Sequence, residues 1–138
     1  MMTKYKLYRL AEKHKIPIIS VRLYGGIEVI AVLNDDGRTA IGIDYEQVAS
    51  EADETYKLAH ELGHCETGAF YNRYSNCDIV SRHEYRADKW AIKKLLPKSE
   101  MEEAFMHGYV EVWQLADYFE APEELIKKAL WIYFDKAA

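Results

Sequence analysis

Residues 55–68 read TYKLAHELGHCETG, with two histidines four positions apart and a glutamate directly after the first. Positions four apart on an α-helix are separated by only about 40° around the axis, so His60 and His64 project from one face. Gly68 lies where a glycine in the left-handed conformation commonly ends a helix. The stretch therefore predicts a helix over roughly residues 53–66 that presents two imidazoles side by side.

This spacing suits a metal ion and a reacting water molecule. Two ring nitrogens can bind one ion, and Glu61, about 100° from His60, can reach a water beside it as a general base. Gly63 costs the helix about 1 kcal/mol relative to alanine, so we expect another element to pack closely against it. Because H-E-x-x-H also occurs by chance in helices, the hypothesis needs a third ligand.

The segment 81–97, SRHEYRADKWAIKKLLP, supplies candidates for that ligand in a second predicted helix that ends before Pro97. One face of this helix carries Glu84, Ala87, Asp88, Ala91 and Leu95. Two acids among small apolar residues need a partner, which a metal and its histidines would provide. We expect Glu84 to complete the coordination and Asp88 to accept the other ring N–H of a ligand histidine.

Other histidines and cysteines fit the pattern less well. His83 is the competing third ligand, but it would project about 100° away from the face that carries Glu84. Cys65 faces away from the histidine pair and is expected to be a small packed residue. His14 and His107 have no companion ligands nearby in sequence, so we expect them at the surface.

Composition narrows the class of protein. A chain of 138 residues with 49% hydrophobic residues is long enough for one folded domain and too apolar for disorder. A net charge of −5 offers no attraction for nucleic acid or an anionic membrane. Without an apolar run of about 20 residues or a signal-peptide core, we expect a cytoplasmic protein with free thiols at Cys65 and Cys77; a disulfide between them is the alternative.

The N-terminal third predicts a short helix and a small sheet. Residues 4–15 have helical spacing of apolar residues and end before Pro17. Strands are expected over 16–24, 27–34 and 38–44, with turns at Gly25-Gly26 and at 34–37. These three strands predict an antiparallel meander, so the fold class is α+β.

The C-terminal part predicts only helices. Ser99 and Glu102 form an S-x-x-E capping box for a helix through about His107, and two more helices are expected over 110–119 and 122–134. We therefore expect a single domain over 1–138, with a catalytic core over about 1–97 and a helical part over about 98–138.

LAHELGH, followed by E-x-x-A-D-x-W-A-x-x-x-L-L-P over 84–97, resembles the ImmA/IrrE family of metallopeptidases and, more widely, the gluzincin arrangement. The resemblance implies a zincin-like core with one zinc bound by His60, His64 and Glu84. It also implies that Glu61 is the catalytic base and that Asp88 supports a ligand from outside the coordination sphere. Members typically cleave a helix-turn-helix repressor of a phage, mobile element or stress operon. The ligand types would also accept manganese or iron.

The end of the chain, residues 108–134, resembles the helix-turn-helix-like tail of that family. Glu123 and Glu124 would occupy the N-terminal turn of its second helix, where they would repel phosphates. We therefore expect this tail to pack or to dock substrate, and direct binding of nucleic acid is not expected.

The sequence thus predicts a zinc-dependent endopeptidase, and a module that binds a repressor without cutting it is the alternative. Glu61 argues for the enzyme, because a purely structural metal site needs no base. A peptidase would also need a hydrogen-bond donor for the oxyanion that forms on the scissile carbonyl. The candidates for this donor are Tyr71, Tyr74, His83 and Tyr85. Strand 38–44 is either the sheet edge that pairs with an extended substrate or a plain structural strand.

Overall fold

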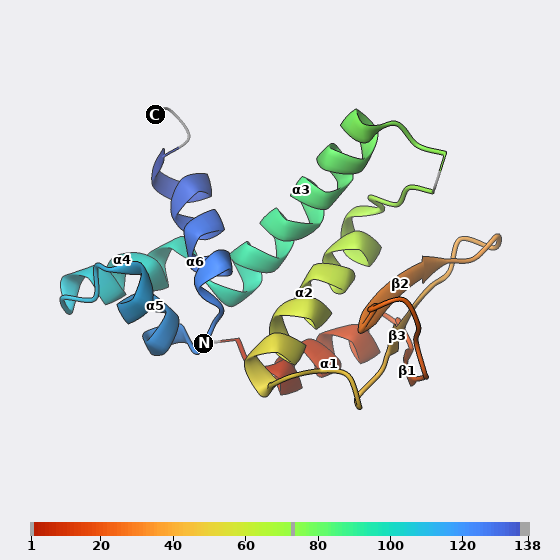
Figure 1. Ribbon diagram of the computed structural model, residues 1–138, viewed down its shortest axis with the longest axis horizontal. Coiled ribbons are helices and arrows are strands. Elements are labelled where there is room, and N and C mark those ends of the chain that lie inside the picture. The colour runs from red at the N-terminus through yellow and green to blue at the C-terminus, as the bar shows by residue number, and fades with distance from the viewer. Residues whose placement is uncertain (1, 73, 136–138) are drawn as a thin grey trace.

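Six α-helices and one three-stranded sheet make up the computed structural model, which describes residues 2–72 and 74–135 (Figure 1). The helices are α1 (Lys4–Lys13), α2 (Glu51–Thr67), α3 (Cys77–Leu95), α4 (Lys98–Met106), α5 (Val112–Phe119) and α6 (Glu123–Leu130). A π-helical turn, Trp131–Asp135, continues α6. The strands are β1 (Ile18–Ser20), β2 (Val29–Leu33) and β3 (Thr39–Ile43). The expected α+β class is confirmed.

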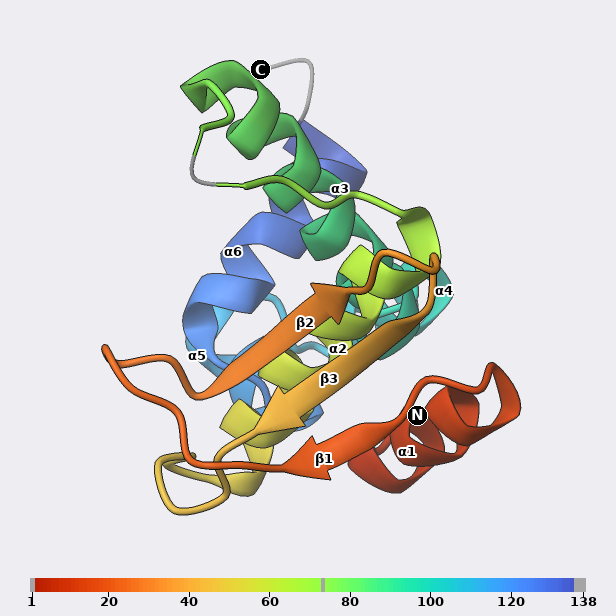
Figure 2. The same cartoon turned by 90° about the vertical axis from the view of Figure 1, so that its right-hand side faces the viewer.

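The sheet is mixed, with β3 in the middle and the strand order β1-β3-β2 (Figure 2). Ile41 of β3 lies opposite Ile18 in the parallel pair with β1 and opposite Ala31 in the antiparallel pair with β2. The expectation of an antiparallel meander is therefore wrong, because the first two strands are not neighbours. β2 and β1 form the two edges.

Side-chain hydrogen bonds explain why Gly25-Gly26 does not turn a hairpin. The Asp44 carboxylate accepts a bond from the backbone N–H of Leu23 at 3.0 Å and another from the Gln47 amide at 2.7 Å. Gln47 in turn donates to the Leu23 carbonyl at 2.9 Å. These bonds hold the segment between β1 and β2 as a loop from one sheet edge to the other. Tertiary contacts here outweigh the β propensity of the apolar run.

The helix that carries the two histidines ends where the sequence predicted. Gly68 has φ of 69°, in the left-handed region that favours glycine, and caps α2. At the other end, Ser50 accepts a hydrogen bond from the N–H of Asp53, which starts the helix slightly before residue 53.

Two other helices begin earlier than expected. α3 starts at Cys77 because the Asn76 side chain accepts a bond from the Ile79 N–H at 2.9 Å. α4 starts at Lys98, directly after Pro97, and Ser99 already lies inside it. The predicted capping box of Ser99 is therefore wrong.

α2 lies at the centre of the molecule, with β2 and β3 on one side and α3 on the other. Leu58 and Leu62 of α2 are fully buried, as are Ile41 and Ile43 of β3. Both layers thus fix the position of α2 and of the histidines on it. Among the described residues, no helix is both long and apolar enough to cross a membrane.

The C-terminal helices pack onto this core through α6. Leu125, Ile126 and Ala129 are buried, and α6 lies against both α5 and α3. Glu120, with φ of 52°, makes the turn between α5 and α6. The tail therefore packs against the rest of the fold, in agreement with the packing expectation.

Candidate metal and catalytic site

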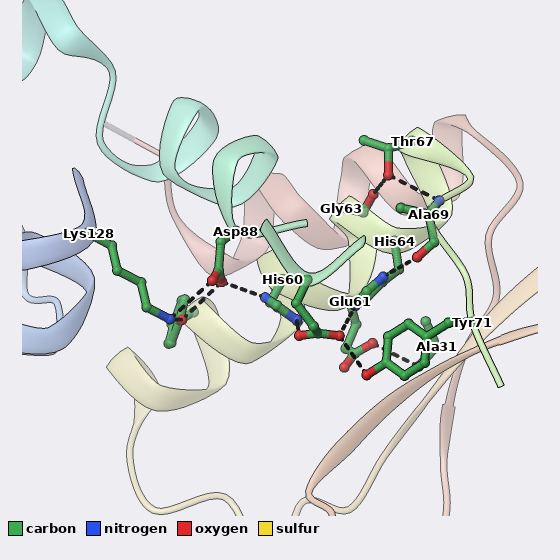
Figure 3. Close-up of polar contacts among 12 residues, drawn as sticks. Ala31, His60, Glu61, Gly63, His64, Thr67, Ala69, Tyr71, Asp88 and Lys128 are labelled. Carbon is green, nitrogen blue, oxygen red and sulfur yellow. Dashed lines mark hydrogen bonds and ion pairs between the residues drawn. The ribbon is translucent and has the colours of Figure 1, made fainter. Parts of the chain in front are cut away.

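Side chains of α2 and α3 converge beside the sheet (Figure 3). His60 Nε2 lies 2.9 Å from Glu84 Oε2, and His64 Nε2 lies 3.0 Å from Glu84 Oε1. One nitrogen of each histidine and one Glu84 oxygen all lie within 4.8 Å of one another. The structure thus brings together the three residues that the sequence predicted as ligands.

A glycine allows the two helices to come this close. A Cβ added to Gly63 would lie 2.6 Å from the carbonyl oxygen of Ala87 and 3.0 Å from its Cα. Real side chains do not tolerate such distances, so only glycine fits against α3 here. The close packing expected behind Gly63 is confirmed.

Both histidines are held by an acceptor at the ring nitrogen that points away from Glu84. His60 Nδ1 donates to Asp88 Oδ1 at 2.8 Å, and His64 Nδ1 donates to the carbonyl of Ala69 at 2.6 Å. These bonds keep a proton on each Nδ1, so Nε2, which faces Glu84, is the nitrogen of each ring that could bind a metal. Sequence reasoning identified Asp88, but it missed Ala69, whose carbonyl faces His64 only because α2 ends at Gly68.

Asp88 is held in turn by residues that the sequence did not indicate. Lys128 Nζ of α6 lies 3.1 Å from Asp88 Oδ2, and the Tyr56 hydroxyl donates to Asp88 Oδ1 at 3.3 Å. Burial acts to raise the pKa of Asp88, but the hydrogen bonds from His60 and Lys128 outweigh it and lower this pKa. Lys128 lies 40 positions from Asp88, so no local pattern could have revealed it.

The histidine rings are strongly influenced by these carboxylates. Burial acts to lower the pKa of His60, but the hydrogen bonds to Asp88 and Glu84 outweigh it and raise the pKa to about 10. The hydrogen bonds from His60 and His64 hold the pKa of Glu84 well below its ordinary value. This concentration of negative charge around two imidazoles suits a cation.

Glu61 reaches from α2 to the sheet. Its Oε2 accepts a hydrogen bond from the backbone N–H of Ala31 in β2 at 3.0 Å. Burial raises the pKa of Glu61, an effect that the nearby histidines oppose. A carboxylate with a raised pKa beside a candidate metal site has the properties of a general base.

Two neighbouring hollows along β2, together the cleft, are both lined by Glu61. One, of about 410 Å³, is bounded by residues 26–29 and by His60, and the other, of about 190 Å³, by Ala31 and Tyr71. Glu61 and Glu84 line both hollows. The candidate base therefore faces the space where a substrate would lie.

The four candidates for a hydrogen-bond donor to the oxyanion occupy different places in the structure. The Tyr71 hydroxyl donates to Glu84 Oε1 at 2.9 Å, within the cluster. His83 stacks on Tyr71 and does not reach the cluster, while its buried Nδ1 has no partner among the described residues. Tyr74 is 80% exposed, and Tyr85 contacts Trp131. Tyr71 is therefore the candidate that the geometry favours.

The remaining predicted residues lie outside the cluster. Cys65 is partly buried, and burial raises the pKa of its thiol to about 11. Cys65 and Cys77, both within the described residues, are not bonded to each other. His14 pairs with Glu66 at the surface, and His107 is exposed at the end of α4.

The edge of the sheet that bounds the cleft is β2. Strand 38–44, proposed above as the substrate-binding edge, contains β3, which has a strand on both sides. That hypothesis is wrong, because its main-chain groups are already paired. At the two ends of the β2–β3 pair, the backbone N–H of Asp44 donates to the Glu28 carbonyl and the backbone N–H of Asn34 donates to the Arg38 carbonyl. In this register the even-numbered residues of β2 exchange main-chain hydrogen bonds with β3. The backbone groups of Val29, Ala31 and Leu33 therefore point outward.

Comparison with known proteins supports the resemblance seen in the motifs. The chain matches the family model described as the IrrE N-terminal-like domain, of the M78 peptidases, over residues 6–130. No curated protein and no solved structure matches the chain significantly. The family match spans the sheet, both site helices and most of the C-terminal helices, and the chain therefore belongs to the M78 peptidase family with the IrrE N-terminal-like domain.

Proposed function

We propose that this protein is a zinc-dependent endopeptidase that binds one zinc ion through His60, His64 and Glu84. The observation that carries the proposal is the convergence of these ligands beside Glu61 and the free edge of β2. The family consists of metallopeptidases, and two imidazoles with one carboxylate match the ligand set of catalytic zinc sites.

The donor atoms present fit a zinc ion. Acceptors engage both Nδ1 atoms, and the potential donor atoms of His60, His64 and Glu84 lie within 4.8 Å of one another. Bound there, zinc would act as a Lewis acid that polarises a carbonyl and acidifies a water molecule. Three protein ligands also leave a coordination position open, as catalysis requires.

Glu61 would move the proton. Its carboxylate takes a proton from the attacking water and delivers it to the nitrogen of the leaving amine. Burial raises the pKa of Glu61, which makes it a better proton acceptor than an exposed glutamate. The bond from Ala31 N–H holds one carboxylate oxygen, so the other is available for the proton.

Tyr71 would stabilise the negative charge that develops on the scissile carbonyl oxygen. Its hydroxyl lies within the cluster and donates to Glu84 in the present geometry. Because a hydroxyl can rotate to another acceptor, Tyr71 can donate to the oxyanion instead.

The outer edge of β2 would hold the substrate in an extended conformation. The outward main-chain groups of Val29 and the carbonyl of Ala31 are available beside the cleft, and those of Leu33 continue the same edge. The Ala31 N–H is already bonded to Glu61. Main-chain pairing of this kind supplies affinity without requiring one sequence. The substrate class implied by the resemblance is a helix-turn-helix repressor. We propose that the protein acts on it in the cytoplasm.

Metal content tests this proposal first. We expect about one zinc per chain in wild type and in Glu61→Gln, and little zinc in Glu84→Ala, because Glu84 is one of the three proposed ligands and Glu61 is not. His83→Ala is the matched control, because His83 is next to Glu84 in sequence but its ring lies outside the cluster. Protein without zinc in all variants would refute the metal site.

Cleavage then separates an enzyme from a binding module. Coexpression with a helix-turn-helix repressor encoded nearby should yield fragments with wild type and none with Glu61→Gln. If both proteins bind the intact repressor equally and neither cuts it, the protein is a binding module.

A further inference from the structure

A third hollow, outside the cleft described above, adjoins the proposed zinc site on the side away from the sheet. It is a groove of about 510 Å³ between α3 and the end of α6. Its walls are Ser81, Glu84, Tyr85, Asp88, Lys127, Lys128, Trp131 and Ile132. Glu84, Asp88 and Lys128 also line the cleft that holds His60 and Glu61. The groove therefore adjoins the place where the substrate would lie, with these three side chains between them.

Most of the charged groups that line the groove already have partners. Asp88 is bonded to His60 and Lys128, and Glu84 is bonded to both histidines and to Tyr71. A charged ligand group would have to compete with these bonds. An apolar group entering the groove has no such competition.

The surfaces that remain for a ligand are aromatic and aliphatic. Tyr85 and Trp131 meet edge to face at 6.4 Å, and 40% and 49% of their surfaces are exposed. Ile132, only 3% exposed, lies in the same groove. Two large exposed aromatic residues beside an active-site cleft are typical of a pocket for an apolar group.

We propose that this groove is a specificity pocket, which takes a bulky apolar, preferably aromatic, side chain of the substrate near the scissile bond. Trp131 is its specificity-determining residue, because it offers the largest apolar surface there. This inference rests on the proposed function, since it assumes that a peptide lies across the zinc site. It adds the side-chain class that the enzyme would prefer.

Small zinc-binding probes test the pocket without requiring cleavage. Acetohydroxamate contains only the metal-binding group, whereas phenylalkyl hydroxamates with linkers of increasing length add an aromatic ring. Their affinities are measured by isothermal titration calorimetry on zinc-loaded wild type, Trp131→Ala and Trp113→Ala. Trp113 is the matched control, because it is also an exposed tryptophan of the C-terminal helices but lies outside the groove.

We expect the best phenylalkyl hydroxamate to bind wild type at least about tenfold more tightly than acetohydroxamate, as burial of a ring predicts. Trp131→Ala should remove most of this advantage and leave the affinity of acetohydroxamate unchanged, while Trp113→Ala should keep both. Equal affinities in wild type, or an undiminished advantage in Trp131→Ala, would overturn the pocket but leave the peptidase proposal standing. If acetohydroxamate fails to bind zinc-loaded wild type, the bound zinc has no position open to a ligand, and the peptidase proposal fails together with the pocket.

Discussion

Gly63 of α2 and Ala87 of α3 meet backbone to backbone, so closely that a Cβ on Gly63 would lie 2.6 Å from the Ala87 carbonyl oxygen. This contact lies between His60 and His64 on one helix and close to Glu84 on the other. The helices could not accommodate a side chain at position 63 without moving apart. The spacing of the three candidate ligands therefore depends on the absence of a side chain at position 63.

Gly63→Ala should weaken zinc binding more than it weakens the fold. The added methyl favours the helix by about 1 kcal/mol, but overpacking costs about 1–3 kcal/mol, so the net loss of stability is modest. Separating the helices moves Glu84 away from the histidines, and zinc affinity should fall at least about tenfold. Urea unfolding and competition with a chromophoric chelator measure the two effects.

Gly42→Ala is the matched control for an added methyl. Its Cβ would meet only side-chain methyl groups, at 3.0 Å from Val21 and 3.6 Å from Ile30, and these can shift. This variant should bind zinc like wild type. Unchanged zinc affinity in Gly63→Ala would contradict the argument from helix spacing.

Helical periodicity made it possible to predict which side chains of each helix share a face. His60 and His64 share a face of one helix, and the acidic positions of 81–97 share a face of the next. The histidines and the acids had to meet if these two faces packed together. Gly63 indicated that another element packs closely there.

The sheet order and the outer partners could not be predicted in this way. The order β1-β3-β2 depends on Asp44 and Gln47, which hold the loop between β1 and β2. The local turn residues of this loop predicted a hairpin. Lys128 reaches Asp88 only because α6 packs on α3. Such contacts join residues far apart in sequence, where periodicity carries no information.

Asp88 should control the affinity of the zinc site although it is not a proposed ligand. Asp88→Ala removes the acceptor that orients His60, so zinc affinity should fall about 10–100-fold. Lys128→Met should have a smaller effect, because Asp88 would keep its bonds to His60 and Tyr56. Chelator competition measures both, with Lys127→Met as the control. Wild-type affinity in Asp88→Ala would show that His60 is held by other means.

Tyr71→Phe should slow cleavage without releasing zinc. Removing one donor to the oxyanion typically costs about 100-fold in kcat, while KM and zinc content should change little. Tyr74→Phe is the control, since Tyr74 is 80% exposed and outside the cleft. Steady-state kinetics of both variants, with a repressor peptide that wild type cleaves as the substrate, measure the loss in each. A larger loss in Tyr74→Phe would assign the donor role to Tyr74.

Proline substitutions should distinguish the middle strand from the edge strand. Gly42 lies opposite Ile30 inside the ladder between β3 and β2, so Gly42→Pro removes a sheet hydrogen bond and should cost about 3 kcal/mol. Leu33→Pro removes an N–H that points outward and should leave the unfolding midpoint nearly unchanged. It should nevertheless impair cleavage, because it blocks main-chain pairing with the substrate. Full activity of folded Leu33→Pro would argue against substrate binding along β2.

Asp44 should make the stability of the fold depend on pH. The hydrogen bond from Gln47, together with those from the N–H groups of Leu23 and Glu46, holds the pKa of this carboxylate below its ordinary value of 3.8. A pKa that is lower in the folded state means that the ionised form stabilises the fold. The contribution is fully present above pH 3.8 and is lost as the pH falls through the lower folded-state pKa.

Asp44→Asn removes the charge and also replaces one of the two acceptor oxygens by an NH2 group, so the pH dependence of its effect, and not its size, reports the charge. Its urea midpoint should lie below that of wild type at neutral pH, and the difference should shrink as the pH falls below 3.8. Asp35→Asn, at an exposed position between β2 and β3, should show no such difference at either pH. A gap between wild type and Asp44→Asn that stays constant with pH would mean that the amide's shape, and not the lost charge, causes the destabilisation. In that case the loop between β1 and β2 would be held by hydrogen-bond geometry alone.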